Sequence, residues 1–338
     1  MKLFGKDLDR EVAIIAEIGV NHEGDPDTAL KLLHLAAETG VDAVKFQTYT
    51  PERFASASDP DRLERVTRFS LDEATLRTLA AEAPGLGVHI FSTAVTEDVM
   101  PLLDELFPVL KIASGDLTFE PVIRVAAKTG KPVILSTGLG TMEEIEAAIC
   151  WVRDEVGEAQ LRDRLVLMHC VSAYPTPIEE ANVLSVPFLT EKTRLRVGYS
   201  NHVIGPEACL AAVALGACMI EVHFTDCKTG REFRDHALSF EPDDMQHLIE
   251  SAGKVRSSLG RFGKQPMECE LENLAAVRKG VVAARDLIEG TVLDDADLMY
   301  ARPAHEFCAA ERPQLIGKTL LHSKGRGETI KRKEIGNA

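Results

Sequence analysis

Short apolar runs alternate with longer amphipathic segments over the first 225 residues of the chain. The runs, rich in β-branched and other apolar residues, cover residues 12–16, 43–47, 88–92, 109–113, 133–136, 165–169, 195–198 and 219–223. The segments between them include residues 27–39, 71–83 and 142–155, whose apolar positions recur with the period of a helix. Eight strands alternating with helices predict an α/β fold, a (β/α)8 barrel, with a doubly wound open sheet as the alternative.

The hydrophobic pattern changes towards the C-terminal end. Short strand-like runs and Gly-containing turns replace the long helices from about residue 274, which is typical of a small β-rich domain. Residues 251–272 combine a polar helix with a stretch of Gly, Pro and charges that suits an exposed linker. We therefore expect a barrel over residues 1–266, a linker over residues 267–276 and a second domain over residues 277–338.

The composition narrows the choice of partners. A formal net charge of −15 argues against nucleic acid or an anionic membrane as a partner, because both require clustered positive charge. No apolar stretch approaches the roughly 18 residues that suggest a membrane helix, and the charged N-terminus differs from a secretory signal. The seven cysteines lack CxxC spacing, which fits reduced thiols. We expect a cytoplasmic protein.

Polar residues stand at or just beyond the end of each predicted strand. In barrels of this kind the catalytic groups gather where strands end and the following loops begin. These residues are Glu17, Asn21, His22, Lys45, Gln47, Ser92, Thr93, Lys111, Ser114, Ser136, Thr137, His169, Ser172, Tyr174, Ser200, Asn201, His202 and His223. They predict an active site at this end of the barrel.

Lys45 and Lys111 lie inside apolar strands, where an unpaired ammonium group is costly. A single lysine in such a place more often forms an ion pair or reaches water with its end. Two of them beside hydroxyl-rich turns favour a bound phosphate or carboxylate. Donors for that anion are available from Ser114, Ser136, Thr137, Ser200 and the loops at Gly115 and Gly138.

His202 and His223 follow neighbouring predicted strands, so their rings can converge on one metal ion. Imidazole binds manganese, iron, cobalt or zinc, and a site with two histidines leaves positions for water and a substrate oxygen. A lone barrel histidine is more often a hydrogen-bonded core residue. We assign that role to His169, and His22 fits either role.

Acidic groups complete the predicted site. Glu17 ends the buried run VAIIAE, where a carboxylate needs a hydroxyl or a cation as its partner. Asp235 and His236 lie in the loop after the eighth predicted strand and can face either the site or solvent.

At this point the sequence closely resembles a known family, the N-acetylneuraminate (sialic acid) synthases with the related legionaminic and pseudaminic acid synthases. The resemblance covers nearly the whole chain. Its motifs are AEIGVNHEGD (16–25), VKFQTY (44–49), FST (91–93), KIASGD (111–116), LSTG (135–138), HCVSAYPTP (169–177), GYSNH (198–202) and EVHFT (221–225). The segment with VVAARDLIEG and ARP resembles the antifreeze-like (SAF) domain that follows the barrel in this family.

The resemblance implies a transferase that condenses phosphoenolpyruvate with the open-chain aldehyde of an N-acylamino hexose, such as N-acetylmannosamine or a diacetamido relative. The products are a nine-carbon 2-keto sugar acid and phosphate. By the same resemblance, phosphoenolpyruvate is held by Lys45, Thr93, Lys111, Ser114, Ser136, Ser200 and Asn201. The sugar is contacted by Glu17, Gln47, Asp116, Ser172, Tyr174 and Asp235.

The resemblance also implies a metal and a partner subunit. His202 and His223 bind a divalent metal, typically manganese, with magnesium or cobalt as alternatives, and Glu17 and Asp235 are catalytic beside them. Arg302 matches an arginine that the antifreeze-like domain of one subunit inserts into the site of the other. A domain-swapped homodimer follows from that role.

The resemblance does not decide the identity of the acceptor sugar. Asp116 stands where glutamate is frequent in the family, Ser172 where asparagine is frequent, and Val222 and Ala304 also depart from the common pattern. Two other functions are compatible with a barrel of this type. One is a phosphoenolpyruvate-dependent aldolase that makes a shorter keto acid, and the other is a catalytically idle barrel that serves assembly.

Overall fold

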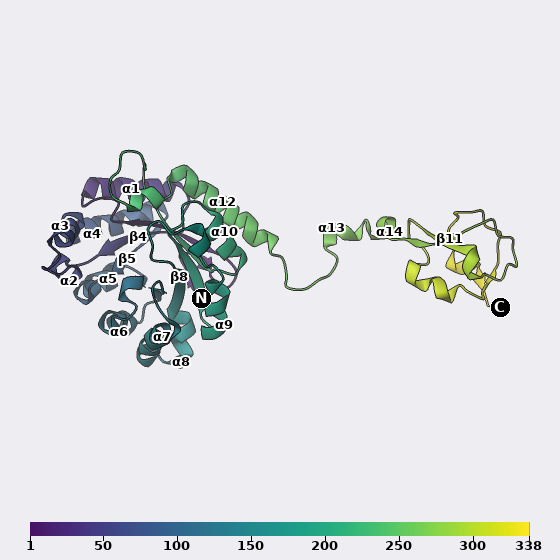
Figure 1. The fold of residues 1–338 in the computed structure, drawn as a ribbon, viewed down its shortest axis with the longest axis horizontal. Coiled ribbons are helices and arrows are strands. Elements are labelled where there is room, and N and C mark those ends of the chain that lie inside the picture. Colours follow the sequence, from purple (N-terminus) through teal and green to yellow (C-terminus); the bar gives the residue numbers. More distant parts are fainter. Residues whose placement is uncertain (338) are drawn as a thin grey trace. The chain divides into compact units, whose positions relative to one another are not determined.

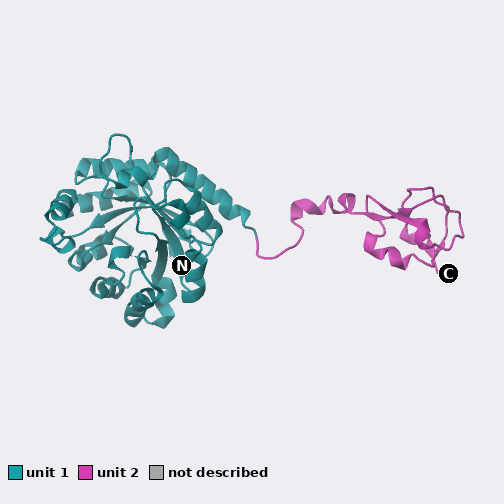
Figure 2. Ribbon diagram, viewed as in Figure 1, with its two compact units in different colours: residues 1–260 teal, residues 261–338 magenta. Residues whose placement is uncertain are grey.

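The computed structural model describes residues 1–337. The chain forms two compact units, Met1–Gly260 and Arg261–Ala338 (Figure 2). The first unit ends six residues before the expected limit at residue 266, because its last helix, α12 (Pro242–Ser258), is followed directly by a turn at Gly260 with φ +60°. The expected linker at residues 267–276 contains two short helices, α13 (Glu268–Leu271) and α14 (Leu274–Val277).

Within residues 1–260, eight parallel strands close into a barrel in the order β10-β3-β4-β5-β6-β7-β8-β9 (Figure 1). The strands are β3 (Ala13–Gly19), β4 (Ala43–Thr48), β5 (His89–Ala94), β6 (Leu110–Ile112), β7 (Val133–Ser136), β8 (Leu165–Cys170), β9 (Arg196–Asn201) and β10 (Met219–His223). Each coincides with one of the predicted apolar runs. The predicted (β/α)8 barrel is confirmed, and the open sheet is wrong because β10 pairs with both β3 and β9.

Helices surround the barrel and bury their apolar stripes on it. They are α1 (Pro26–Glu38), α4 (Glu73–Glu82), α5 (Met100–Leu106), α6 (Glu120–Lys128), α7 (Met142–Val156), α8 (Glu158–Arg164), α9 (Ser185–Thr193), α10 (Glu207–Ala214) and α12. Side chains at the N-caps Asp25, Asp72 and Thr141 accept the backbone N–H groups that would otherwise lack a partner at the starts of α1, α4 and α7. These caps fix the residue at which each helix begins.

The strands approach closely where the sequence has a glycine. A Cβ atom at Gly198 in β9 would lie 2.7 Å from the Met219 carbonyl oxygen of β10. This position therefore requires glycine for the two strands to pair. Since β9 and β10 carry His202 and His223 at their ends, that close pairing also brings the two histidines together.

Two additional helices follow β4 on the loop side of the barrel. These are α2 (Pro51–Phe54) and α3 (Pro60–Phe69). A small apolar cluster fixes them there, formed by Val20, Tyr49, Ala55, Val66 and Phe69 with Phe54, Leu63, Val95 and Phe233 packed against it. The segment 51–70 is therefore a structured insertion at the mouth of the barrel.

The second unit is small and rich in short strands, with its own core. Its antiparallel pairs are β11 (Gly280–Ala283) with β12 (Leu298–Ala301) and β13 (Thr319–Leu320) with β14 (Ile335–Gly336). The core contains Val281, Ala283, Leu287, Leu293, Leu298, Phe307, Leu315, Leu320 and Ile330. Its likeness to an antifreeze-like domain stays a prediction from the sequence.

The remaining elements of the chain are short. An N-terminal hairpin pairs β1 (Lys2–Leu3) with β2 (Lys6–Asp7), and α11 (Asp235–Leu238) follows β10. The 3-10 helices are Ala83–Leu86, Glu97–Val99, Ser114–Asp116, Ile178–Glu180, Asp295–Asp297, Ala309–Gln314 and Arg332–Glu334. Among residues 1–337, none of the helices has the length and apolar character needed to cross a membrane.

Candidate active site

A cavity of about 930 Å³ opens where the barrel strands end. It is lined from below by strand-end residues and from the side by the insertion at α2 and α3 and the loop after β10. Fourteen residues that the sequence assigned to the site line it: Glu17, Lys45, Gln47, Thr93, Lys111, Ser114, Asp116, Ser136, Ser172, Tyr174, Ser200, His202, His223 and Asp235. The loops therefore gather side chains that lie far apart in the sequence.

Lys45 lies between two carboxylates at the base of the cavity. Its Nζ is 2.7 Å from Glu17 Oε2 and 3.6 Å from Glu221 Oε1, and it donates to Thr93 Oγ1 at 3.0 Å. Burial disfavours the ammonium ion, but the two carboxylates outweigh that effect and raise the pKa of Lys45. Lys45 is therefore held as a cation.

The strand register explains why Glu17 has these neighbours. In the pairing of β3 with β4 and β10, Glu17 stands opposite Lys45 on one side and His223 on the other. Gln47 Nε2 donates to Glu17 Oε1 at 2.9 Å, so amide and ammonium together hold the carboxylate in place. Burial nevertheless raises the pKa of Glu17.

Lys111 forms the second cationic centre. Its Nζ donates to Ser136 Oγ at 2.6 Å and to the Ile112 carbonyl oxygen at 3.2 Å. Burial lowers the pKa of Lys111, and Glu221 acts in the opposite direction. An incoming anion would stabilise the charged form of this lysine.

Glu221 is a member of the site that we did not assign from the sequence. It lies in β10, lines the cavity and is only 5% exposed. Ser200 donates to Glu221 Oε1 at 3.0 Å. Burial favours the neutral acid, but Lys111 and Lys45 outweigh it and lower the pKa of Glu221. A carboxylate inside the apolar run MIEVH was the signal available in the sequence, since it is the counterpart of the two strand lysines.

A serine-rich turn lies beside Lys111. Ser114 Oγ accepts the Gly138 backbone N–H at 3.0 Å and lies 3.4 Å from Cys170 Sγ. A Cβ at Gly138 would lie 2.5 Å from Ser172 Oγ and 2.8 Å from Ser114 Oγ, so a larger residue here would displace these two hydroxyl groups. Hydroxyl groups and a narrow backbone turn thus adjoin the ammonium group.

The two candidate metal ligands lie side by side at the ends of β9 and β10. The ring centroids of His202 and His223 are 5.4 Å apart. His202 Nδ1 lies 2.7 Å from the Val171 carbonyl oxygen, which fixes Nδ1–H and leaves Nε2 as the lone-pair nitrogen. His223 Nδ1 is buried and has no hydrogen-bond partner among residues 1–337.

This donor set fits a divalent metal with an open coordination sphere. A buried imidazole nitrogen without a partner is costly unless something binds it, and the neighbouring ring is oriented by a carbonyl group, as metal-bound histidines commonly are. No group of three or more His, Cys, Asp and Glu that could hold a metal occurs within the described residues. A metal here would take further ligands from substrate and water.

Asp235 and Tyr174 border the histidines. Asp235 Oδ2 lies 4.0 Å from His223 Nδ1, and the Tyr174 ring is centred 4.1 Å from that of His202. Burial raises the pKa of Asp235, while the neighbouring Arg234, 3.3 Å away, opposes the shift. Arg234 also lies over the Tyr174 ring at 4.9 Å. Of the two loop residues left open by the sequence, Asp235 faces the cavity.

The structure places one of the assigned residues away from the cavity. Asn201 was expected to hold phosphoenolpyruvate, but it does not line the cavity. Its Nδ2 donates to the Val203 carbonyl oxygen at 2.7 Å, and its Oδ1 accepts from Tyr199 and from the Val203 backbone. Side chains alternate along a strand, so Ser200 and Asn201 face opposite sides.

Other polar residues at the strand ends form hydrogen bonds to the backbone and stabilise the strands and loops around the site. Thr137 Oγ1 donates to the Met168 carbonyl oxygen, and His169 Nε2 lies 2.9 Å from the Ala181 carbonyl oxygen, in agreement with the core role expected for this histidine. His22 Nδ1 accepts the Gly24 backbone N–H at 3.0 Å. Arg302 belongs to the second unit, where its side chain is exposed.

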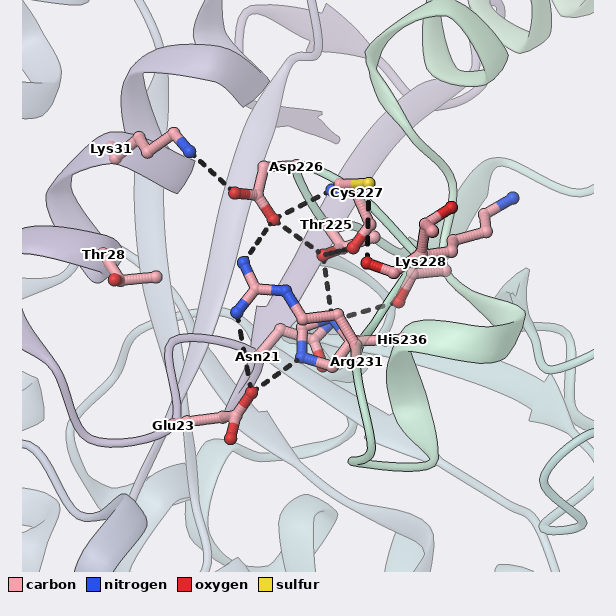
Figure 3. A network of polar contacts seen from close by, with 12 residues as sticks. Asn21, Glu23, Thr28, Lys31, Thr225, Asp226, Cys227, Lys228, Arg231 and His236 are labelled. Carbon is pink, nitrogen blue, oxygen red and sulfur yellow. Dashed lines mark hydrogen bonds and ion pairs between the residues drawn. The ribbon is translucent and has the colours of Figure 1, made fainter.

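The loop after β10 is fastened to the loop after β3 by a charged network (Figure 3). Asp226 accepts from Lys31 at 2.7 Å and from Arg231 at 2.8 Å. Glu23 lies 3.3 Å from His236 Nε2 and 3.8 Å from Arg231. Because Asp235 adjoins His236, this network fixes the segment that presents Asp235 to the cavity.

The NeuB family matches residues 32–264, which is more than half of the chain. The matched range contains all of the cavity residues discussed above except Glu17, Val20 and Glu23.

Individual relatives are similar over nearly the whole length. N,N'-diacetyllegionaminic acid synthase of Campylobacter jejuni is 33% identical, covering 95% of this chain and 99% of its own. Human N-acetylneuraminate-9-phosphate synthase is 30% identical, covering 96% and 92%. The crystal structure of N-acetylneuraminic acid synthetase from Leptospira borgpetersenii in complex with citrate superposes with a TM-score of 0.73 at 32% identity, covering 78% of this chain and 90% of that one.

Proposed function

The chain belongs to the NeuB family, and we propose that it condenses phosphoenolpyruvate with the open-chain form of an N-acylamino hexose. The products are a nine-carbon 2-keto sugar acid and phosphate. The relatives named N,N'-diacetyllegionaminic acid synthase and N-acetylneuraminate-9-phosphate synthase are about equally similar to this chain. The acceptor that we propose is N-acetylmannosamine or a diacetamido relative. One observation carries the proposal: two buried lysines and two adjacent histidines line the same cavity.

Phosphoenolpyruvate is held at the base of the cavity. Lys111 and Lys45 attract its phosphate and carboxylate groups, and each lysine already has a hydroxyl partner that an anion can share, Ser136 and Thr93 respectively. Ser114 and Ser200 complete the set of donors. Asn201 supports this set indirectly, by fixing the turn at Val203.

The sugar lies above phosphoenolpyruvate, with its aldehyde towards the histidines. In the reaction, C3 of phosphoenolpyruvate forms a bond to the aldehyde carbon, water adds at C2, and phosphate leaves. Glu17 has a raised pKa and lies next to both Lys45 and His223, which suits proton transfer at this point. Contacts to the rest of the sugar come from Gln47, Asp116, Ser172, Tyr174 and Asp235.

We assign a divalent metal, manganese first and magnesium or cobalt as alternatives, to His202 and His223. When bound, it supplies a Lewis acid that orients and polarises the aldehyde oxygen. The support is the partnerless Nδ1 of His223 and the carbonyl-oriented ring of His202. The enzyme is then a metal-dependent transferase that acts in the cytoplasm.

Arg302 completes the site from a partner subunit in this proposal. Its exposed side chain stands in the ARP motif of the second unit. An arginine can hold sugar hydroxyls or a carboxylate with its planar N–H fork. A homodimer in which the second units are exchanged would therefore have two complete sites.

The test is phosphate release from phosphoenolpyruvate with a panel of acylamino hexoses. We expect release only with an N-acyl or diacylated acceptor and loss of release after chelation or in His202→Ala. Arabinose 5-phosphate and erythrose 4-phosphate serve as shorter acceptors. Better turnover of either would replace this proposal by a shorter-chain synthase, and release that survives metal removal would exclude the metal.

A further inference from the structure

Leu139 lies in the loop after β7 at the mouth of the cavity, and its side chain is 81% exposed. Within residues 1–260, the other large apolar side chains that are exposed, by 37–65%, do not line the cavity. Single exposed apolar side chains are common on protein surfaces and need no explanation by themselves. Leu139 differs from the others in its position and also in its backbone conformation.

The backbone of Leu139 is left-handed, with φ +64°. The Gly140 backbone N–H donates to the Thr137 carbonyl oxygen at 3.2 Å, so Leu139 is the third residue of a tight turn. Glycine or asparagine normally occupies this position of a turn when φ is positive, because a side chain is strained there. Leucine at residue 139 therefore costs stability that glycine would retain.

Packing compensates the same strain at Phe4 but not at Leu139. Phe4 also has a positive φ, +51°, but it is only 6% exposed and its ring stacks on that of Phe91 at 5.1 Å. The side chain of Leu139 has no comparable burial. A strained and exposed apolar residue at the edge of a substrate cavity indicates a role in binding a ligand.

The residues before Leu139 hold the turn in this form. The Gly138 backbone N–H donates to Ser114 Oγ at 3.0 Å, which joins the turn to the loop after β6. The Thr137 backbone N–H donates to the Met168 carbonyl oxygen of β8, also at 3.0 Å. The turn is therefore fixed to both neighbouring strands of the barrel, and it presents Leu139 to the cavity before any substrate binds.

The turn lies close to the pair of histidines. Cys170 Sγ lies 3.9 Å from His202 Nδ1, and a Cβ at Gly138 would lie 3.0 Å from the same sulfur. Ser172 Oγ would lie 2.5 Å from that Cβ. The one hydrogen bond of the Ser172 hydroxyl within residues 1–337 is a long contact with the sulfur, at 4.0 Å. This hydroxyl can therefore donate to a ligand that lies beside Leu139.

The chemistry of the two proposed substrates decides which group meets Leu139. Phosphoenolpyruvate carries two anionic groups, and the chain of the sugar carries hydroxyl groups. The acyl group of a 2-acylamino hexose ends in an alkyl part, which is apolar. This group is attached to the carbon next to the aldehyde, so it lies near the histidines whenever the aldehyde does.

We propose that Leu139 contacts the alkyl part of the acyl group on the acceptor sugar and thereby sets the preference of the enzyme for that group. The inference rests on the proposed function. The Ser172 hydroxyl donates to the acyl carbonyl oxygen, and Leu139 covers the methyl group beyond it. Binding removes both apolar surfaces from water, which stabilises the complex in proportion to the area buried.

The experiment compares two acceptors that differ by one methyl group, the N-formyl and the N-acetyl form of the same 2-amino hexose. Phosphate release from phosphoenolpyruvate is measured with the full-length wild type and its variants. We expect the wild type to prefer the N-acetyl acceptor by about tenfold in kcat/KM. Leu139→Asn keeps the left-handed turn but loses the apolar surface, so the preference should fall to about twofold. Leu139→Met should retain it.

Thermal denaturation separates this role from a structural one. Leu139→Gly relieves the left-handed strain, so its Tm should be no lower than that of the wild type. Arg194→Gly is the matched control, because Arg194 is exposed, has φ +60° and lies at the end of α9 outside the cavity. It should leave the preference for the N-acetyl acceptor unchanged.

An unchanged preference in Leu139→Asn would overturn the inference and leave the proposed function intact. A Tm of Leu139→Gly below that of the wild type would also overturn it, because the side chain would then stabilise the substrate-free fold. So would a smaller mass of Leu139→Asn by light scattering, since a second copy of the chain would then be the partner of Leu139. Absence of phosphate release by the wild type with every acylamino hexose would instead remove the proposed function, and this inference with it.

Discussion

Glu221 sets the charge balance at the base of the cavity. It lies 3.6 Å from Lys45 and accepts from Ser200, and it provides the largest favourable interaction with the charge of Lys111. The ammonium groups of Lys45 and Lys111, 3% and 2% exposed, are thus balanced by the buried carboxylates Glu17 and Glu221, 2% and 5% exposed. Removal of one carboxylate would leave a buried positive charge without compensation.

We expect Glu221→Gln to lower the free energy of unfolding by about 3 kcal/mol, because breaking a buried pair on one side is strongly destabilising. Urea denaturation of the substrate-free protein measures this change. Phosphoenolpyruvate should recover part of it, since its charge can partner the lysines.

The matched control for Glu221 is Glu250→Gln. Glu250 is exposed and pairs with Lys254 at 3.5 Å on the surface of α12. An exposed pair of this kind contributes about 0.3–0.5 kcal/mol. Similar losses for the two variants would show that Glu221 is not a counter-charge for the lysines.

Asp116 should make stability depend on pH. Burial raises its pKa from 3.8 to about 6, and Lys111 only partly opposes the shift. Between these two values the folded chain holds a proton that the unfolded chain has released, so stability falls as the pH rises towards 6 and beyond. Asp116→Asn removes this titration, and its Tm should exceed that of the wild type increasingly from pH 4 to pH 7.

The exposed residue Asp27 on α1 provides the comparison for Asp116. The Tm difference between Asp27→Asn and the wild type should not rise in this way from pH 4 to pH 7. A constant Tm difference for Asp116→Asn from pH 4 to pH 7 would contradict the burial-driven shift.

At the scale of elements, the loop between β10 and α12 is the part of the site most dependent on polar contacts. Arg231 joins Asp226 to Glu23, and His236 contacts both Glu23 and Thr225 (Figure 3). These contacts fix α11 and therefore Asp235. Charged contacts near solvent are individually weak, so the position of the loop depends on several acting together.

Arg231→Met should free this loop without unfolding the barrel. We expect faster amide hydrogen exchange over residues 226–238 and a loss of about tenfold in kcat/KM, with little change in Tm. Lys228→Met is the control, since Lys228 pairs with Asp244 at 3.0 Å and takes no part in the contacts to Glu23. Unchanged exchange in Arg231→Met would show that the network does not hold the loop.

At the scale of the molecule, the two units have separate cores, so each can be altered by itself. A chain ending after Gly260 should remain folded, with a far-ultraviolet spectrum and cooperative melting typical of the barrel. It should lose most of its activity if the second unit supplies Arg302 to the site. Full activity of this truncated chain would reject that role.

Mixing two inactive variants tests the exchange of second units directly. His202→Ala damages the barrel and Arg302→Ala damages the second unit, so a hybrid dimer has one site in which both residues are intact. Random mixing should restore about a quarter of wild-type activity if the sites are shared between subunits. No recovery, with hybrid dimers shown to form, would place each site within a single chain.

The amino-acid sequence by itself determined the barrel and most of the chemical groups of its site. Alternation of apolar runs and helices is a local property, and strands buried on both faces must read as apolar runs. Polar side chains at their ends, such as Lys45 and His202, are therefore visible without any structure. The sequence motifs at these strand ends and in the loops that follow them also determined the family resemblance.

Only the tertiary structure decided which of these groups face the cavity and what they contact. Ser200 and Asn201 are adjacent, but the pairing register turns the first inwards and the second onto Val203. The contact of Glu221 with Lys45 depends on barrel closure, and the position of α3 depends on the packing of Val66 and Phe69 at the mouth of the barrel. These relations join residues far apart in the chain, and such relations arise when strands and helices pack together.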